Sequence, residues 1–291
     1  MVLLILALLA CCSREESPTT PTTPPTSTAT TTLAGPTSTS SPTSTLGAIL
    51  TARTVVQSQT RRPYLLSYPQ GAQRGDSLPL IIAFHGFGGS ASAFREATNL
   101  DELGQREGVL IAYPQGVERG KGGTEWNPYN PDGAYISSND HLYTEGVIQD
   151  IARDFVITTT LAVGYSNGGM MAYGLLCHQR VALDGIGAIS ATMLADQGCS
   201  QPEQIPILVI HGTNDGVLPF DGAALIQSTR SVVDFWRDAY GLLDPPQIDT
   251  PAAGITREDY GAINLYIVER GEHDWFDFSN ALIAAHLLNF N

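Results

Sequence analysis

A serine stands within a Gly-x-Ser-x-Gly pattern in the middle of the chain, at positions 164–168 (GYSNG). An apolar run precedes the pattern and a helix-forming segment follows it, which predicts a tight turn from strand to helix. Such a turn exposes the Ser166 hydroxyl at a helix N-terminus, where free N–H groups and the helix dipole favour developing negative charge. The pattern also occurs in plain tight turns, but this context favours Ser166 as a nucleophile.

A serine hydroxyl is a weak nucleophile at neutral pH, so it needs a base that a third group orients. Downstream of Ser166, two further apolar runs end in segments that carry Asp215 and His273. Because 49 and 58 residues separate the three side chains along the chain, only the fold can bring them together. We predict that Ser166 is the nucleophile, His273 the base and Asp215 the acid that orients it.

Other side chains compete for the acid and base roles. Asp221 is an alternative to Asp215, but it follows Pro219 and Phe220 and is typical of a helix N-cap. His85 and His211 each precede a glycine at a strand end and are interpreted as loop braces. The remaining histidines lie in helical segments or upstream of the serine, and they are His141, His178 and His286.

A tetrahedral intermediate needs at least two N–H groups aimed at its oxygen. We predict that Asn167, which follows the nucleophile, supplies one of them. The glycine-rich loop 85–89 (HGFGG) is predicted to supply the other, through the N–H of Phe87. A phosphate-binding loop would need a Gly-Lys-Ser/Thr ending, which this loop lacks.

Two features bear on substrate and metal binding. Residues 114–143 form a glycine-rich stretch that is either a functional loop or a surface excursion with its own small core. From it we predict that Trp126 lines a substrate pocket together with Tyr165 and Trp275. The run 272–274 (EHD) resembles metal ligands, but adjacent side chains on an extended segment alternate in direction and no second His/Cys cluster supports a site. We therefore expect no metal and no cofactor.

The elements that must position these residues alternate between strand and helix. Continuous apolar runs typical of buried strands cover 80–84, 109–113, 159–163, 185–190, 207–210 and 263–268. Helix-like segments cover 91–106, 145–155, 168–177, 222–240 and 280–289. This alternation predicts an α/β fold, with a mostly parallel central sheet and helices on both faces. Chemistry in such sheets gathers at the carboxyl ends of the strands, where the candidate residues fall.

The composition excludes several classes of protein. The 291 residues include 15 basic and 29 acidic side chains, a formal net charge of −14, which disfavours nucleic acid as a partner. With 43% hydrophobic and 15% charged residues, the body of the chain should fold around a large core. No apolar run reaches the roughly 20 residues that cross a bilayer as a helix, so a multispan membrane protein is excluded.

The first 46 residues are predicted to be a targeting signal followed by a flexible linker. Residues 1–10 are apolar and form a signal segment, and the sequence LLAC at 8–11 resembles a bacterial lipobox, which would make Cys11 a lipidated first residue. A plain cleaved signal and an accidental apolar terminus are the alternatives, since no basic residue precedes the run. Residues 11–46 are rich in Thr, Ser and Pro and are predicted to be a disordered tether, which leaves 47–291 as the catalytic domain.

The cysteines bear on the compartment. In an exported chain we expect a disulfide between Cys177 and Cys199, closing a 23-residue loop. In a cytosolic chain the same two residues would be reduced thiols. Cys12 has no assigned partner in either case.

Four segments, 85–89, 164–171, 211–215 and 271–275, together resemble the polyhydroxybutyrate depolymerase-like and feruloyl esterase-like carboxylic ester hydrolases of the α/β-hydrolase fold, which include envelope lipoprotein esterases. The similarity spans roughly 64–291. It implies a secreted serine esterase, in contact with the membrane only through a lipid anchor, that acts on polyester oligomers or on acyl groups of plant polysaccharide. Residues 139–141 and the acidic residues on either side of His273 differ from the usual pattern of this family, and these differences concern substrate choice. A serine peptidase of the same fold and a catalytically inactive envelope binding module are the alternatives.

Overall fold

The computed structural model describes residues 48–57, 60–118, 122–128, 139–193, 199, 203–224 and 226–289. The chain divides into two units, Met1–Leu46 and Gly47–Asn291, and every described residue belongs to the second. The predicted signal segment, the lipidation site at Cys11 and the tether therefore lie outside the described residues. Within the described ranges, no helix has the length and apolar character needed to cross a bilayer.

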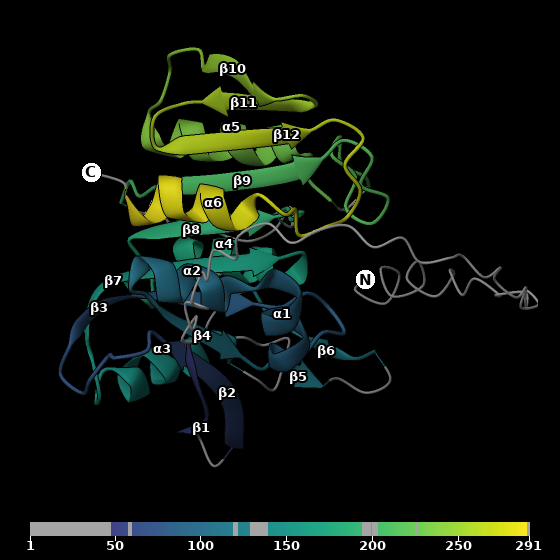
Figure 1. The fold of residues 1–291 in the computed structure, drawn as a ribbon. Coiled ribbons are helices and arrows are strands. Elements are labelled where there is room, and N and C mark those ends of the chain that lie inside the picture. The colour runs from purple at the N-terminus through teal and green to yellow at the C-terminus, as the bar shows by residue number, and fades with distance from the viewer. Residues whose placement is uncertain are drawn as a thin grey trace, which may run out of the picture. The chain divides into compact units, whose positions relative to one another are not determined.

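A ten-stranded sheet forms the centre of this second unit, with the strand order β1-β2-β4-β3-β7-β8-β9-β12-β11-β10 (Figure 1). The six inner strands are parallel to one another. They are β4 (Leu110–Pro114), β3 (Ser77–Phe84), β7 (Val156–Tyr165), β8 (Gly185–Ile189), β9 (Ile207–Gly212) and β12 (Ile263–Val268). Two antiparallel strands extend each side, β1 (Ile49–Gln57) with β2 (Thr60–Tyr68), and β11 (Ile255–Asp259) with β10 (Gln247–Ala252).

The inner strands are apolar at almost every residue because both faces of the sheet are covered. In β7, for example, Leu161 and Val163 join one core while Ala162 joins the other. Helices α1 (Ala91–Thr98), α2 (Leu100–Glu107) and α6 (Ser279–Ile283), with the π-helical turn η2 (Ala284–Leu288), cover the first face. Helices α3 (Asp140–Ile151), α4 (Asn167–His178) and α5 (Thr229–Tyr240) cover the second. The predicted α/β architecture is confirmed.

Two predicted helices differ from the observed ones at their ends. The segment 91–106 is two helices, because Asn99 takes a left-handed conformation (φ 51°) and its N–H caps α1 at the Arg95 carbonyl. The predicted helix 222–240 begins only at Thr229, after Ser228, whose hydroxyl accepts the N–H of Ser231. Asp221 is therefore not the N-cap that its sequence context suggested.

The four outer strands were not predicted from the sequence. Strand β10 is exposed along its whole length, and its pairing with β11 shifts register between Asp249 and Ala252. A strand that buries neither face has no need of a periodic apolar pattern, so the usual sequence signal is missing. A separate small ribbon, β5 (Val117–Glu118) with β6 (Thr124–Glu125), lies in the long stretch after β4.

Cys177 and Cys199 form a disulfide, with their Cα atoms 4.4 Å apart, as predicted. Cys177 is the penultimate residue of α4 and is fully buried. The bond thus ties the end of the helix that follows Ser166 to the segment that follows β8.

Candidate active site

Ser166 occupies the turn between β7 and α4 and is the N-cap residue of that helix. Its φ of 54° is unusual for a residue with a side chain and costs on the order of 1–3 kcal/mol. The flanking glycines permit this turn, because a Cβ on Gly164 would collide with the Gly168 backbone and one on Gly168 with the Phe84 carbonyl. The predicted strand, turn and helix around Ser166 are thus present in the structure.

Asp215 and His273 lie together at the carboxyl ends of β9 and β12, where Nδ1 of His273 donates to Oδ2 of Asp215 at 2.7 Å. The other carboxylate oxygen, Oδ1, accepts the N–H groups of Val217 and Leu218, each at 2.8 Å. Burial alone would raise the pKa of Asp215, but hydrogen bonds from His211, His273 and Leu218 outweigh it and hold that pKa well below its usual range. Asp215 is therefore ionised at neutral pH, and its negative charge keeps the proton of His273 on Nδ1, which leaves Nε2 as an acceptor.

His211 contacts Asp215 and the loop that follows it. Its Nε2 lies 2.8 Å from the Leu218 carbonyl and 3.2 Å from Oδ2 of Asp215, while its Nδ1 lies 3.0 Å from the Thr229 hydroxyl. These partners fit a ring that carries its proton on Nε2 and accepts at Nδ1. The ring is fully buried, so its position fits the prediction that His211 braces a loop.

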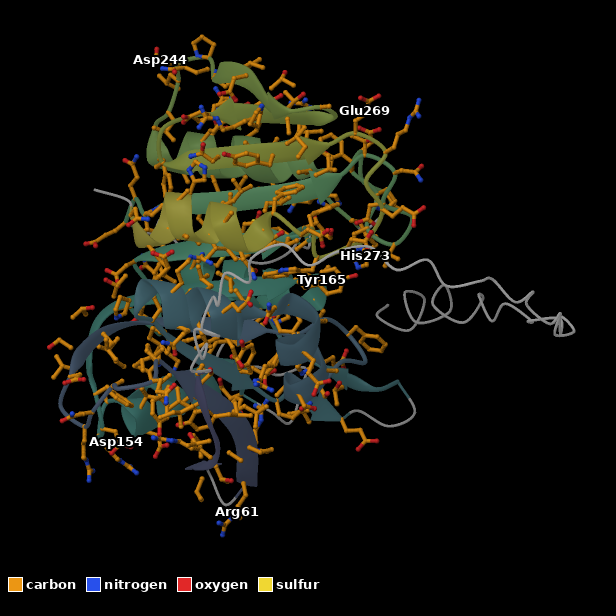
Figure 2. The ribbon with its side chains drawn as sticks, in the orientation of Figure 1. Arg61, Asp154, Tyr165, Asp244, Glu269 and His273 are labelled. Atoms are coloured by element: carbon orange, nitrogen blue, oxygen red, sulfur yellow. A yellow bond between two sulfur atoms is a disulfide. The ribbon has the colours of Figure 1, made fainter. Side chains whose placement is uncertain are left out.

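Two hydroxyl groups fasten the backbone around His273. The Tyr165 hydroxyl donates to the His273 carbonyl at 2.7 Å, and the Ser190 hydroxyl donates to the Asp274 carbonyl at 2.8 Å. Tyr165 and His273 lie side by side at one edge of the sheet, with their ring centroids 5.0 Å apart (Figure 2). The sequence indicated neither contact, because a hydroxyl that binds a backbone carbonyl leaves no pattern of residue types.

Tyr165 directly precedes Ser166, so the residue next to the predicted nucleophile contacts the predicted base. The Ser166 hydroxyl itself makes no hydrogen bond with any residue that the structure describes. A hydrogen bond between a nucleophile and its base is often long without substrate and shortens in the complex. The arrangement brings the predicted acid and base together.

The loop 85–89 follows β3 and lies against the turn that bears Ser166. A Cβ on Gly86 would stand 3.4 Å from the Cβ of Ser166. The Gly86 carbonyl accepts two hydrogen bonds, from the N–H of Gly89 at 3.1 Å and from Nδ1 of His85 at 2.7 Å. Because N–H and C=O point in opposite directions across a trans peptide bond, these two donors also fix the direction of the Phe87 N–H.

The backbone N–H groups of this loop differ in whether they have a hydrogen-bond acceptor. The N–H of Gly88 donates to the Thr124 carbonyl at 2.7 Å, whereas the N–H of Phe87 finds no acceptor within the described part of the chain. Nε2 of His85 accepts the N–H of Gly116 at 3.0 Å, and burial lowers the pKa of this histidine. His85 is thus a neutral brace of the loop, as its place before a glycine indicated.

The aromatic residues predicted for a substrate pocket differ in their exposure. Trp126 is only 2% exposed and donates from Nε1 to the His85 carbonyl at 2.9 Å, so it supports the loop from within and does not line an open wall. Trp275 is half-buried and packs edge-on against Phe94, with ring centroids 5.3 Å apart. His141 is buried, edge-on to His178 at 5.4 Å.

Across the described ranges, no group of three or more His, Cys, Asp or Glu side chains is arranged to hold a metal ion. The residues on either side of His273, Glu272 and Asp274, are exposed and acidic.

The sheet order, the two helical layers and the site residues at the strand ends define an α/β hydrolase. A model of the phospholipase/carboxylesterase family matches residues 72–234, more than half of the chain, and the chain belongs to this family. It is a carboxylic ester hydrolase.

The chain is similar to several characterised or curated proteins. It is 27% identical over 197 residues to a probable feruloyl esterase C of Aspergillus terreus, covering 62% of this chain and 70% of the relative. It is 25% identical over 228 residues to feruloyl esterase C of Emericella nidulans, covering 73% and 76%. The solved acetyl xylan esterase of Aspergillus awamori shares the fold, with a TM-score of 0.61 at 13% identity, covering 77% of this chain and 94% of that structure.

Proposed function

We propose that the chain is an exported serine esterase in which Ser166, His273 and Asp215 form a catalytic triad. The observation that carries the proposal is the hydrogen bond of 2.7 Å between His273 and a buried, ionised Asp215, directly beside the turn that bears Ser166. The backbone N–H groups of Phe87 and Asn167 would bind the oxyanion. The membership of an ester hydrolase family supports the reaction class.

In the proposed first half-reaction, the Ser166 oxygen bonds to the ester carbonyl carbon while its proton passes to Nε2 of His273. The carbonyl π electrons move onto the oxygen, which the two N–H groups stabilise as an oxyanion. The oxyanion then collapses and the bond to the alcohol oxygen breaks. The proton on His273 passes to that oxygen, and an acyl-enzyme on Ser166 remains.

In the second half-reaction, water loses a proton to His273 and attacks the acyl carbon. The new tetrahedral intermediate collapses, the carboxylic acid leaves, and His273 returns the proton to Ser166. Asp215 stays ionised throughout and stabilises the imidazolium that forms twice in the cycle. Its depressed pKa suits this role because a carboxylate that bound the proton itself would no longer hold the ring.

For the substrate, we propose aromatic or short acyl esters that decorate plant polysaccharide, ahead of hydroxybutyrate oligoesters. The support comes from the relatives named feruloyl esterase C. A rate panel of methyl ferulate, acetylated xylan and hydroxybutyrate oligomers on residues 47–291 would rank the three.

Export is proposed because a disulfide persists in oxidising compartments outside the cytosol. Lipidation at Cys11 after removal of residues 1–10, followed by a tether over 11–46, completes the proposal and rests on the sequence alone. Mass spectrometry of the mature N-terminus tests it, and an unprocessed Met1 would exclude the anchor.

The triad is tested with Ser166→Ala. This variant removes the oxygen that attacks the ester, so kcat on p-nitrophenyl acetate should fall by about three orders of magnitude or more. The thermal midpoint should stay close to that of the wild type, and a fluorophosphonate probe should label the wild type but not the variant. Ser92→Ala, on the exposed face of α1, is the matched control and should keep full activity. Near-normal turnover by Ser166→Ala would refute the proposed function.

A further inference from the structure

Trp126 makes hydrogen bonds to both segments that carry the proposed oxyanion donors. Its indole N–H donates to the His85 carbonyl at 2.9 Å, at the start of the loop that bears Phe87. Its backbone N–H donates to Oδ1 of Asn167 at 2.7 Å, and its backbone carbonyl accepts from Nδ2 of Asn167 at 3.2 Å. One buried residue thus connects the loop after β3 with the first residue of α4.

The neighbouring Thr124 fastens the same loop at a second place. Its carbonyl accepts the N–H of Gly88 at 2.7 Å, and its hydroxyl donates to the Gly89 carbonyl. Together with the bonds of Trp126, these contacts hold the loop at residues 85, 88 and 89. The Phe87 N–H makes no hydrogen bond within the described residues.

Trp126 also holds Asn167, the residue that carries the second proposed donor. Its side-chain amide pairs with the backbone of Trp126 through two hydrogen bonds, which fixes the start of α4 relative to the loop. The backbone N–H of Asn167 belongs to the first turn of the helix, so it has no acceptor within the helix. An oxyanion donor requires a residue whose position is fixed and whose backbone N–H has no acceptor within the helix.

The position of Trp126 is itself fixed by a buried ion pair. Nη1 of Arg62 lies 2.5 Å from Oδ1 of Asp140, and Oδ2 of Asp140 accepts the N–H of Asn127 at 2.7 Å. The Arg62 guanidinium also lies 5.7 Å from the centroid of the Trp126 ring. Because Arg62 and Asp140 are both buried, this support is shielded from solvent.

We propose that Trp126 is a positioning residue that sets the distance between the two oxyanion donors, Phe87 N–H and Asn167 N–H. The inference rests on the proposed function, because it assigns a purpose to the same site. Trp126 does not touch the reacting atoms. It acts by holding two separate backbone segments, one after β3 and one at the start of α4, in a single arrangement that is present before substrate binds.

The test compares two buried tryptophans. Trp126→Phe keeps an aromatic ring and removes the N–H that holds the His85 carbonyl. Trp236→Phe is the matched control, since Trp236 is also fully buried but its indole N–H has no partner within the described residues. We expect kcat on methyl ferulate and p-nitrophenyl acetate to fall about 10- to 100-fold for Trp126→Phe, somewhat less than the loss of a whole donor, with KM within about threefold. Trp236→Phe should keep kcat within about threefold.

A boronic acid inhibitor, which forms a tetrahedral adduct with a serine, supplies the second readout. Its inhibition constant should rise in parallel with the loss of kcat in Trp126→Phe and stay unchanged in Trp236→Phe. Equal kcat in the two variants, or an unchanged inhibition constant in Trp126→Phe, would overturn the positioning role. If Ser166→Ala retained activity, the proposed function would fail instead, so the two failures are distinguishable.

Asn167→Ala keeps the inference testable if Trp126→Phe folds poorly. It removes both bonds between the Asn167 side chain and Trp126 but leaves the Asn167 N–H in place. We expect a similar fall in kcat, and in the double variant the two losses should not multiply, because both variants break the same connection. A double variant whose loss equals the product of the single losses would overturn the shared role.

Discussion

His273 is held at three points that come from three different strands. Asp215 after β9 fixes its ring nitrogen, Tyr165 at the end of β7 binds its carbonyl, and Ser190 after β8 binds the carbonyl of the next residue. In the proposed mechanism, these contacts would keep the ring within hydrogen-bond reach of Ser166, as proton transfer requires. Tyr165 makes its contact from the position directly before Ser166. A movement of Ser166 would therefore also move the residue that holds His273.

Tyr165→Phe isolates this contact. It removes the hydroxyl that holds the His273 carbonyl and keeps the ring. We expect kcat to fall about 3- to 30-fold, because a hydrogen bond of about 0.5–1.5 kcal/mol is lost and His273 becomes freer to move. Steady-state kinetics on p-nitrophenyl acetate measure the effect. Tyr68→Phe in β2, whose hydroxyl has no hydrogen bond within the described ranges, is the control and should leave kcat unchanged. Equal kcat for the two variants would show that the contact does not position the base.

At this scale the sequence indicated the types and order of the site residues but not their supports. Asp215 and His273 could be predicted as partners because each follows an apolar run that becomes a parallel strand. The buried role of Trp126 could not, since an aromatic residue in a long loop has the same sequence signature whether it meets substrate or supports a neighbouring loop. Its exposure of 2% distinguishes the two cases.

At the scale of elements, the parallel strands β3, β7, β8, β9 and β12 bring their carboxyl ends to one edge of the sheet, and each contributes a residue to the site. These strands are nearly continuous apolar runs, which is why the inner sheet could be predicted. Among the outer strands, β10 could not be predicted because it is exposed and therefore carries no periodic apolar signal. The break between α1 and α2 was also missed, since it depends on the backbone of one residue, Asn99.

The disulfide at the end of α4 makes a prediction at this scale. Cys177→Ala with Cys199→Ala opens a loop of about 23 residues, which should lower the free energy of unfolding by about 3 kcal/mol through the larger entropy of the unfolded chain. Urea unfolding measures the loss, and kcat should change little because Cys177 lies at the opposite end of α4 from Ser166. A reducing agent should destabilise the wild type and leave the double variant unaffected. Equal stability of the oxidised and reduced wild type would contradict this prediction.

At the scale of the whole molecule, burial lowers the pKa of several histidines, so stability depends on pH. Burial is the main cause for His85, His178 and His286, with Arg62 adding to the effect at His85 and Arg257 at His286. A histidine whose pKa is lower in the folded chain binds fewer protons there than in the unfolded chain. Stability then falls as the pH drops below the unfolded value of about 6.5.

We therefore expect the free energy of unfolding to decrease between pH 7 and pH 5 at constant ionic strength. Buried His85 alone would contribute up to about 1.4 kcal/mol per pH unit while its folded form stays neutral. Asp215 acts in the same direction but only in more acid solution, because its unfolded pKa is near 3.8. Urea unfolding curves at several pH values measure the slope. A stability that stays flat or rises over this interval would contradict the prediction.

The irregular outer strand β10 has a consequence for how the molecule behaves at high concentration. An open sheet can recruit a strand from another chain when its border offers an even row of unpaired N–H and C=O groups. In β10, Pro251 has no N–H to offer, Asp249 brings a negative charge, and the register shift between Asp249 and Ala252 breaks the spacing. This border of the sheet is therefore a poor template for self-association, although every residue of β10 is exposed in the described part of the chain.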